Sequence, residues 1–127
     1  MKSLTRYIQE KLIIKKSKSN SYKYFPETKE ELKDIILQRI KEEGKEVDLN
    51  DIDVSKITDM SKLFEGIDFN GDISNWDVSN VTNMYAMFYF CKTFNKDISG
   101  WDVSNVKTLN FIFDNCSIEE KYKPKFK

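Results

Sequence analysis

A pattern of apolar and polar positions recurs along this chain with a period of 24 to 25 residues. Residues 72–81 return as residues 97–106 at an offset of 25, and residues 49–64 carry a degenerate copy at an offset of 24. The apolar positions of the second copy are Ile73, Trp76, Val78, Val81, Met84, Met87 and Phe88. A recurrence of this length predicts repeat units, here residues 48–71, 72–96 and 97–117.

Each unit is expected to contain two parts. Residues 73–81 are rich in β-branched and aromatic side chains and indicate a short extended segment with turns. Thr82 and Asn83 can then cap a short helix with Met84, Met87 and Phe88 on one face. One unit cannot bury its apolar side alone, so the units should lie against one another. That arrangement would place Val54, Val78 and Val103 side by side.

A different pattern precedes the repeats. Thr28 followed by Glu31 is typical of a capping box at a helix start, and Gly44 stands where a helix C-cap is expected. The residues between them repeat at helical spacing on one face, namely Leu32, Ile35, Ile36 and Ile40. The pattern predicts a helix over residues 29–43 that covers the N-terminal end of the repeats.

The two ends of the chain are less regular. Residues 3–16 indicate another helix, residues 17–21 a polar linker and residues 22–25 a short strand. The tail 118–127 lacks helical periodicity and is expected to be disordered or bound to a partner. The expected organisation is a basic helical region with a capping helix (1–47), a repeat segment (48–117) and a basic tail (118–127). The apolar end of the last unit must be covered by the tail, a second copy or a partner.

Charge divides the chain although its net charge is zero. Residues 1–24 carry seven Lys or Arg against one Glu, a local charge of +6, whereas residues 48–117 carry eleven Asp or Glu against five Lys, a local charge of −6. Such asymmetry can steer association with a partner. No secretory signal or long apolar span is visible, and only Cys91 and Cys116 are present, so we expect a cytoplasmic protein.

The repeated motif D-I-S-x-W-D-V-S-N-V resembles the bacterial surface repeat family described as BspA-like leucine-rich repeats or mycoplasma-lipoprotein-type repeats. The resemblance covers residues 48–117, and the helix 28–44 is expected to belong to it. It implies an α/β (or α+β) fold, in which a helical cap precedes a short leucine-rich-repeat-like parallel solenoid of about three units. It also implies a binding role without catalysis. This chain would be a short form that lacks the signal peptide and lipid-anchor cysteine of the family.

Two rows of repeated polar residues have a chemical and a structural interpretation. Aspartates recur at Asp53, Asp77 and Asp102, and stacked carboxylates could hold Ca²⁺. The alternative, which we favour, is that they bond local backbone in turns. Cys91 and Cys116 occupy equivalent positions and could approach disulfide distance, or else serve as small buried fillers. The sequence predicts no metal and no cofactor.

Aromatic and basic residues are the candidate contacts. We assign partner binding to Tyr85, Tyr89, Phe90, Trp76 and Trp101, with core packing as the alternative for the tryptophan row. Nucleic-acid contact through the basic N-terminal region would involve Arg6, Lys11, Lys15, Lys16, Lys18 and Lys23, and the alternative is a solvated helix face with a Lys-rich linker.

These observations favour a non-enzymatic binding protein. The chain has no histidine and no glycine-rich phosphate loop, and nothing in the sequence selects a catalytic pair among its carboxylates. We expect an intracellular inhibitor of a host defence system of the phage or mobile-element type, for example an anti-CRISPR. Its partner would be a host protein or ribonucleoprotein, with RNA contact and a homodimer through the last repeat as further options. The alternative is a surface adhesion or virion structural fragment.

Overall fold

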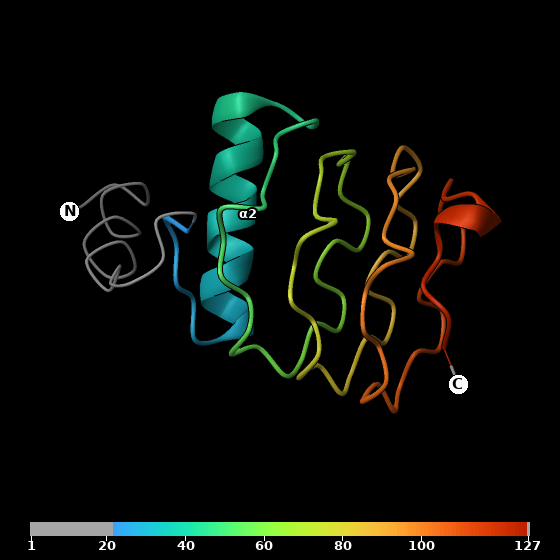
Figure 1. The fold of residues 1–127 in the computed structure, drawn as a ribbon. Coiled ribbons are helices and arrows are strands. Elements are labelled where there is room, and N and C mark those ends of the chain that lie inside the picture. Colours follow the sequence, from blue (N-terminus) through green and yellow to red (C-terminus); the bar gives the residue numbers. More distant parts are fainter. Residues whose placement is uncertain (1–21, 127) are drawn as a thin grey trace.

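A computed structural model describes residues 22–126 of the chain. The expected helix 3–16 and linker 17–21 lie outside the described residues. Within them the regular elements are one α-helix, α2 (Lys29–Glu43), and one 3-10 helix, η2 (Glu120–Tyr122). Figure 1 shows α2 at one end of a row of irregular units and the C-terminal segment at the other end. The core lies between these units and α2.

The expected leucine-rich-repeat-like parallel solenoid is wrong. Residues 22–126 contain no strand, and parallel pairing is limited to the isolated bridges Tyr24 to Ile52, Asp59 to Asn83 and Asn83 to Thr108. The short helix expected around Met84 is also absent. The α/β description and the terms leucine-rich repeat and solenoid therefore do not apply, because each unit is built almost entirely from turns.

Consecutive turns replace the short helices because neighbouring peptide groups bond in different directions. Alternate residues of unit 2 donate their backbone N–H to unit 3, as in Met84 to Thr108 and Ala86 to Asn110. The residues between them donate within the turn, as in Met87 to the Met84 carbonyl and Tyr85 to the Asn83 side chain. Ala86 has a φ of 52°, which lies in the left-handed region and is incompatible with an α-helix. The periodicity of Met84, Met87 and Phe88 thus reflects turns that bury one side.

Equivalent side chains of neighbouring units lie in contact despite the absence of strands. The Trp76 and Trp101 rings stack with centroids 6.4 Å apart and 4° between planes. The Phe64 and Phe88 rings do the same at 5.4 Å and 6°. Val54, Val78 and Val103 are all buried members of a single core cluster. Burial of these rows supplies the main stabilisation, at about 25 cal/mol per Å² of apolar surface.

Helix α2 is confirmed with the predicted bounds. The Thr28 side chain accepts a hydrogen bond from the N–H of Glu31, and the Gly44 N–H donates to the Ile40 carbonyl. Leu32, Ile35 and Ile36 are fully buried against unit 1. The sequence pattern missed Arg39, which is buried and pairs with Asp51 at 2.9 Å. This ion pair ties the helix to the first unit.

The tail covers part of the last unit and is regular in part. The Ile98 N–H donates to the Tyr122 carbonyl at 3.0 Å, and Ile118 and Pro124 are buried. Of the three covers that the sequence allowed for the last unit, the structure shows this one over residues 118–126. The expectation that the tail is disordered is therefore wrong for these residues.

Among residues 22–126 no helix is long and apolar enough to cross a membrane.

Candidate partner-binding surface

Two exposed phenylalanines occupy backbone positions that disfavour bulky side chains. Phe90 has a φ of 58° and Phe111 a φ of 62°, both in the left-handed region. The residues at the position of Phe90 in the other units are Gly66 and Asn115, the residue types that tolerate this region best. The turn geometry requires a positive φ here, whereas it does not require phenylalanine.

Four aromatic side chains gather around these positions and form what we call the aromatic patch: Tyr85, Tyr89, Phe90 and Phe111. Tyr89 meets Phe90 edge to face at 4.5 Å between ring centroids, and Tyr85 meets Phe111 at 5.9 Å. Tyr89 and Phe111 are 6.1 Å apart, which makes the patch continuous. Phe90 is 40% exposed and Phe111 is 51% exposed. Neighbouring rings of this exposure lie outside the core and form a candidate contact surface.

Two lysines and a pocket border the aromatic patch. Lys62 lies over the Tyr85 ring at 5.9 Å and Lys92 over the Phe90 ring at 5.8 Å. A pocket of about 480 Å³ adjoins Phe90 and is also lined by Gly66, Ile67, Asp68, Lys92 and Thr93. The site therefore combines exposed aromatic rings, an adjacent pocket and two lysines at its border. This combination suits a side chain of another macromolecule.

The predicted contact residues fall into two groups. Tyr85, Tyr89 and Phe90 come together in the aromatic patch. Trp76 and Trp101 are only 4% and 5% exposed, so they do not form an exposed ladder, and core packing describes them. Each indole N–H donates to a carbonyl of the preceding unit, Leu49 and Ile73 respectively. These bonds satisfy the polar edge of each ring and explain why tryptophan is tolerated in the core.

The sequence reasoning missed Phe111. Its equivalents in the other units are Lys62 and Ala86. The signal for Phe111 was that a large apolar residue stands at a position where the other units do not have one. Ala86 is buried, whereas Phe111 lies in the last unit and projects to solvent. The comparison of repeats by position, rather than by helical spacing, would have found it.

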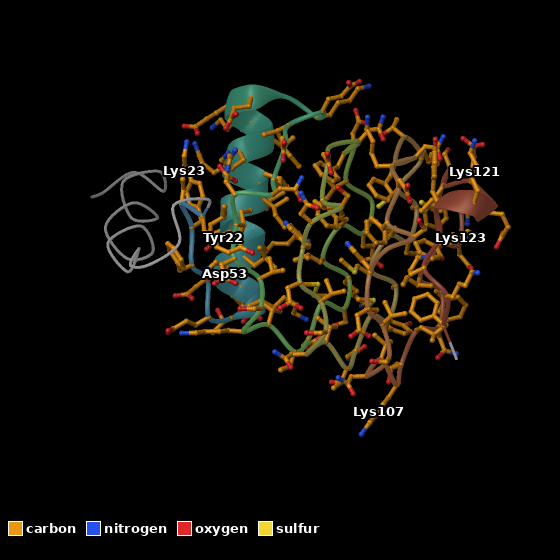
Figure 2. The ribbon with its side chains drawn as sticks, viewed as in Figure 1. Tyr22, Lys23, Asp53, Lys107, Lys121 and Lys123 are labelled. Atoms are coloured by element: carbon orange, nitrogen blue, oxygen red, sulfur yellow. The ribbon has the colours of Figure 1, made fainter. Side chains whose placement is uncertain are left out.

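Most of the predicted nucleic-acid residues lie outside the described part of the chain, namely Arg6, Lys11, Lys15, Lys16 and Lys18. Lys23 is described and exposed, and its backbone N–H donates to the Asp51 carbonyl beside unit 1. Figure 2 shows Lys23 at the α2 end, whereas Lys107, Lys121 and Lys123 lie toward the opposite end. The structure therefore does not join these lysines into one basic surface.

The aspartate rows bond the backbone of their own turns, as the structural interpretation predicted. Asp53, Asp77 and Asp102 each accept from the N–H and hydroxyl of the serine two positions later. The same bonds from Ser74 lower the pKa of Asp72 below its ordinary value. Among residues 22–126 no three metal-binding side chains form a cluster. Because the carboxylates are occupied by turn bonds, the calcium interpretation finds no support.

The cysteines act as buried fillers. The Cys91 thiol is fully buried and donates to the Phe64 carbonyl at 2.8 Å. Burial raises the pKa of Cys91 to about 12, so the thiol stays protonated at neutral pH and is unreactive. Cys116 is partly buried, and both thiols are free.

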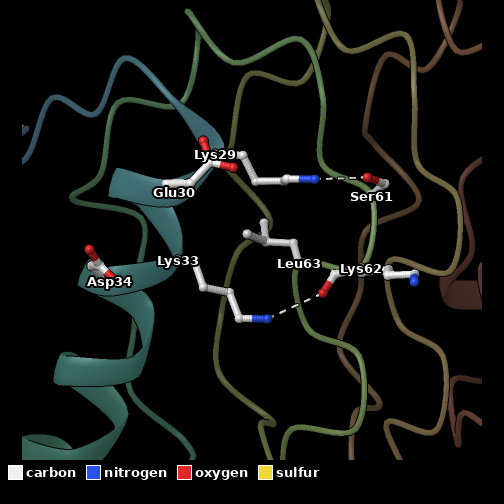
Figure 3. Close-up of a pocket in the computed structure, with 7 residues that line it drawn as sticks. All are labelled: Lys29, Glu30, Lys33, Asp34, Ser61, Lys62 and Leu63. Carbon is white, nitrogen blue, oxygen red and sulfur yellow. Dashed lines mark hydrogen bonds between the residues drawn. The ribbon is translucent and has the colours of Figure 1, made fainter.

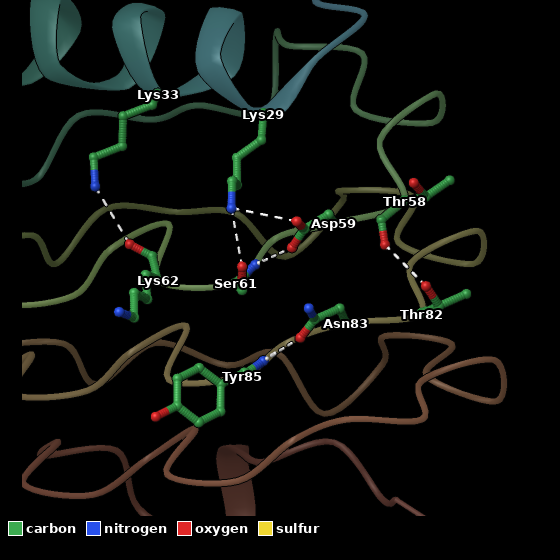
Figure 4. A network of polar contacts seen from close by, with 9 residues as sticks. All are labelled: Lys29, Lys33, Thr58, Asp59, Ser61, Lys62, Thr82, Asn83 and Tyr85. Carbon is green, nitrogen blue, oxygen red and sulfur yellow. Dashed lines mark hydrogen bonds and ion pairs between the residues drawn. The ribbon is translucent and has the colours of Figure 1, made fainter.

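A second surface joins α2 to unit 1 through lysines. A pocket lies between the helix and residues 61–63, and Figure 3 shows the side chains that line it. Its volume is about 290 Å³. Lys29 donates to Ser61 at 2.9 Å and pairs with Asp59, and Lys33 donates to the Lys62 carbonyl at 3.3 Å (Figure 4). Burial lowers the pKa of Lys33. Because these lysines hold α2 against unit 1, we assign the pocket to the contact between the helix and this unit.

A family model matches most of this chain. The model of the DUF285 family, described as Mycoplasma protein of unknown function, matches residues 32–123, which include most of α2 and all three units. No curated protein and no solved structure matches. The family description carries no function, so the expected inhibition of a host defence system by a phage-type or anti-CRISPR protein is without support and is not retained. With well over half of its length matched, the chain belongs to this Mycoplasma family of unknown function.

Proposed function

We propose that this chain is a non-enzymatic protein that binds another protein through the aromatic patch. The observation that carries the proposal is the placement of Phe90 and Phe111, both exposed and both at left-handed backbone positions. A bulky residue at such a position costs about 1 kcal/mol relative to glycine. Strained, exposed apolar residues are retained where they serve contact with a ligand or partner.

The chemistry of the patch suits a protein partner. Aromatic rings with adjacent cations supply most of the binding energy at many protein interfaces, and a central ring can contribute about 2 kcal/mol or more. Lys62 and Lys92 lie over ring faces and would add polar contacts at the edge. The pocket beside Phe90 can receive one side chain of the partner.

The test compares partner capture by two variants of the full chain. Phe90→Asn combined with Phe111→Asn removes both exposed rings, while asparagine suits the left-handed backbone. The matched control is Leu37→Asn, because Leu37 is 43% exposed on α2 and is not part of the patch. Each protein is immobilised, exposed to cell lysate, and the bound proteins are quantified.

We expect a protein captured by the wild type to be retained by the Leu37 variant and reduced at least roughly tenfold by the double variant. Equal capture by all three proteins would reject the patch as the contact. Recovery of nucleic acid that disappears at high salt, without a patch-dependent protein, would instead favour binding through the basic N-terminal region.

A further inference from the structure

Two rows of backbone donors join the three units in the same direction. In unit 1 the N–H groups of Met60, Lys62, Phe64 and Gly66 donate to carbonyls of unit 2 at 2.8–2.9 Å. In unit 2 the N–H groups of Met84, Ala86, Phe88 and Phe90 donate to carbonyls of unit 3 at 2.7–3.0 Å. Each row runs from an earlier unit to a later one, so the turns carry donors on one side and acceptors on the other.

The equivalent row of unit 3 has no acceptor within residues 22–126. Its members, one repeat later, are the N–H groups of Leu109, Phe111, Phe113 and Asn115, and no hydrogen bond from any of them occurs in this part of the chain. We call this row the donor edge. Leu109, Phe113 and the nearby Val106 are half-buried, which leaves an apolar floor beside the donors.

The opposite end of the row of units is already closed. There α2 lies against unit 1, and its Lys29 and Lys33 donate to the Ser61 hydroxyl and to the Lys62 carbonyl (Figure 4). Neither bond reaches the carbonyls of residues 59, 61, 63 and 65, which are the unit 1 equivalents of the carbonyls that accept in unit 2. The two existing rows show instead that main-chain carbonyls are the partners of these N–H groups, so the donor edge requires carbonyl oxygens.

A second copy of the chain fits the donor edge poorly. Two donor edges brought together would oppose N–H to N–H, and the acceptor side of unit 1 is covered by α2. Charge does not select an anion either, since residues 101–126 carry four lysines (107, 121, 123, 125) and four acids (102, 114, 119, 120), a net charge of zero. A polypeptide main chain supplies carbonyls without requiring charge.

We propose that the donor edge binds a segment of a partner polypeptide that presents main-chain carbonyls at alternate residues and adds as a further unit. The interface would repeat the two that exist within the chain, with apolar side chains of the partner over Leu109 and beside Phe113, whose ring lies under Lys123 of the tail at 5.4 Å. Main-chain pairing would supply the register, and the half-buried floor would supply selectivity for apolar side chains. The inference does not require that the aromatic patch be a contact.

The experiment measures amide hydrogen exchange by NMR on the ¹⁵N-labelled full chain, alone and with a synthetic peptide of residues 107–117. This peptide carries the carbonyls that already accept from unit 2. Alone, the four donor-edge amides should exchange rapidly, whereas those of Met84, Ala86, Phe88 and Phe90 should be protected. Saturating peptide should slow the donor-edge amides by roughly tenfold or more.

Two variants locate the contact. Leu109→Lys places a charge on the floor and should abolish the slowing, as charged residues do on exposed edges. The matched control Asn110→Lys changes an exposed neighbour and should leave the slowing intact. In the same spectra, the protection of the unit 2 amides from hydrogen exchange shows whether each variant is folded. Neither substitution alters the aromatic patch, so this test can fail while the proposed function stands.

Three outcomes overturn the proposal. Donor-edge amides that are protected in the free protein at all concentrations would mean that the chain itself covers them. Protection that grows with protein concentration would mean that a second copy does. Unchanged exchange at these four amides under saturating peptide would mean that the edge does not accept a further unit.

Discussion

The backbone position of Phe90 costs stability, and the proposed binding role would account for that cost. Gly66 and Asn115, its equivalents in the other units, also have a positive φ. The turn therefore forms in those units without an aromatic ring. The ring at Phe90 is 40% exposed, so a large part of its apolar surface stays in contact with water in the folded chain. The trade between strain and contact is a general property of binding sites.

The serine and aspartate pairs make the turns sensitive to acid. In Asp72 the hydrogen bonds from the Ser74 N–H and hydroxyl hold the pKa of the carboxyl below its ordinary value of about 3.9. A depressed folded-state pKa gives stability that is present above the unfolded pKa and lost as the pH falls through the folded one.

We therefore expect Ser74→Ala to lower the free energy of unfolding at pH 7 by about 0.5 kcal/mol, a modest value because the carboxylate is exposed. The difference from the wild type should shrink as the pH falls from 7 through the lowered pKa of Asp72 and the carboxyl becomes protonated in the folded protein. Urea unfolding over a series of pH values measures it. A difference that stays constant with pH would show that the hydroxyl acts independently of the charge.

Local chemistry explains which residues could be assigned a structural role from the sequence alone. The aspartates were correctly placed in turns because an Asp followed two positions later by Ser carries its own bonding partner. The spacing of apolar residues could not show whether Phe111 is buried. A following unit covers Ala86, whereas residues 22–126 contain no such unit after Phe111. The sequence alone does not show where the row of units ends.

Helix α2 and the turns of the repeats differ in where their hydrogen bonds go. All of the signals for α2 lie within the segment itself, from the Thr28 cap to Gly44, and the helix has the predicted bounds. The turns after Thr82 have helix-like apolar spacing, but alternate N–H groups bond to residues about 24 positions away. Periodicity cannot distinguish these two arrangements, which is why the short helices were predicted wrongly.

Gly71 is a position at which close packing between segments requires glycine. A Cβ atom there would overlap the Val47 carbonyl oxygen and press on the Phe69 ring, both beside the first unit. We expect Gly71→Ala to destabilise the fold by about 1–3 kcal/mol, since backbone must shift to admit the methyl group. Thermal or urea unfolding measures this change.

Gly100 provides the matched control for that substitution. It lies 29 residues later in an exposed turn, and a Cβ built there meets no atom within 4 Å. Gly100→Ala should therefore change the free energy of unfolding by less than about 0.5 kcal/mol. Equal effects of the two substitutions would show that the contact between Val47 and Gly71 is not tight.

The molecule as a whole has two different ends. Helix α2 covers the acceptor side of unit 1 and is tied to it by Arg39 and Asp51, while residues 118–126 cover only part of unit 3 (Figure 1). The contacts between successive units could be anticipated from the repeat, because one unit cannot bury its own apolar side. The direction of the bonds between units could not be anticipated, since it depends on left-handed residues that include Lys62, Ala86 and Phe111, whose residue types do not indicate that conformation.

The account rests on the claim that Phe90 and Phe111 are held for binding and not for folding. Its most direct test is the free energy of unfolding of Phe90→Asn combined with Phe111→Asn, beside the core control Phe88→Ala. We predict that the double variant stays within about 0.5 kcal/mol of the wild type or exceeds it, because asparagine relieves the left-handed strain. Phe88→Ala should lose about 3–5 kcal/mol. A loss of more than about 1 kcal/mol in the double variant would contradict the claim and assign both rings to the fold.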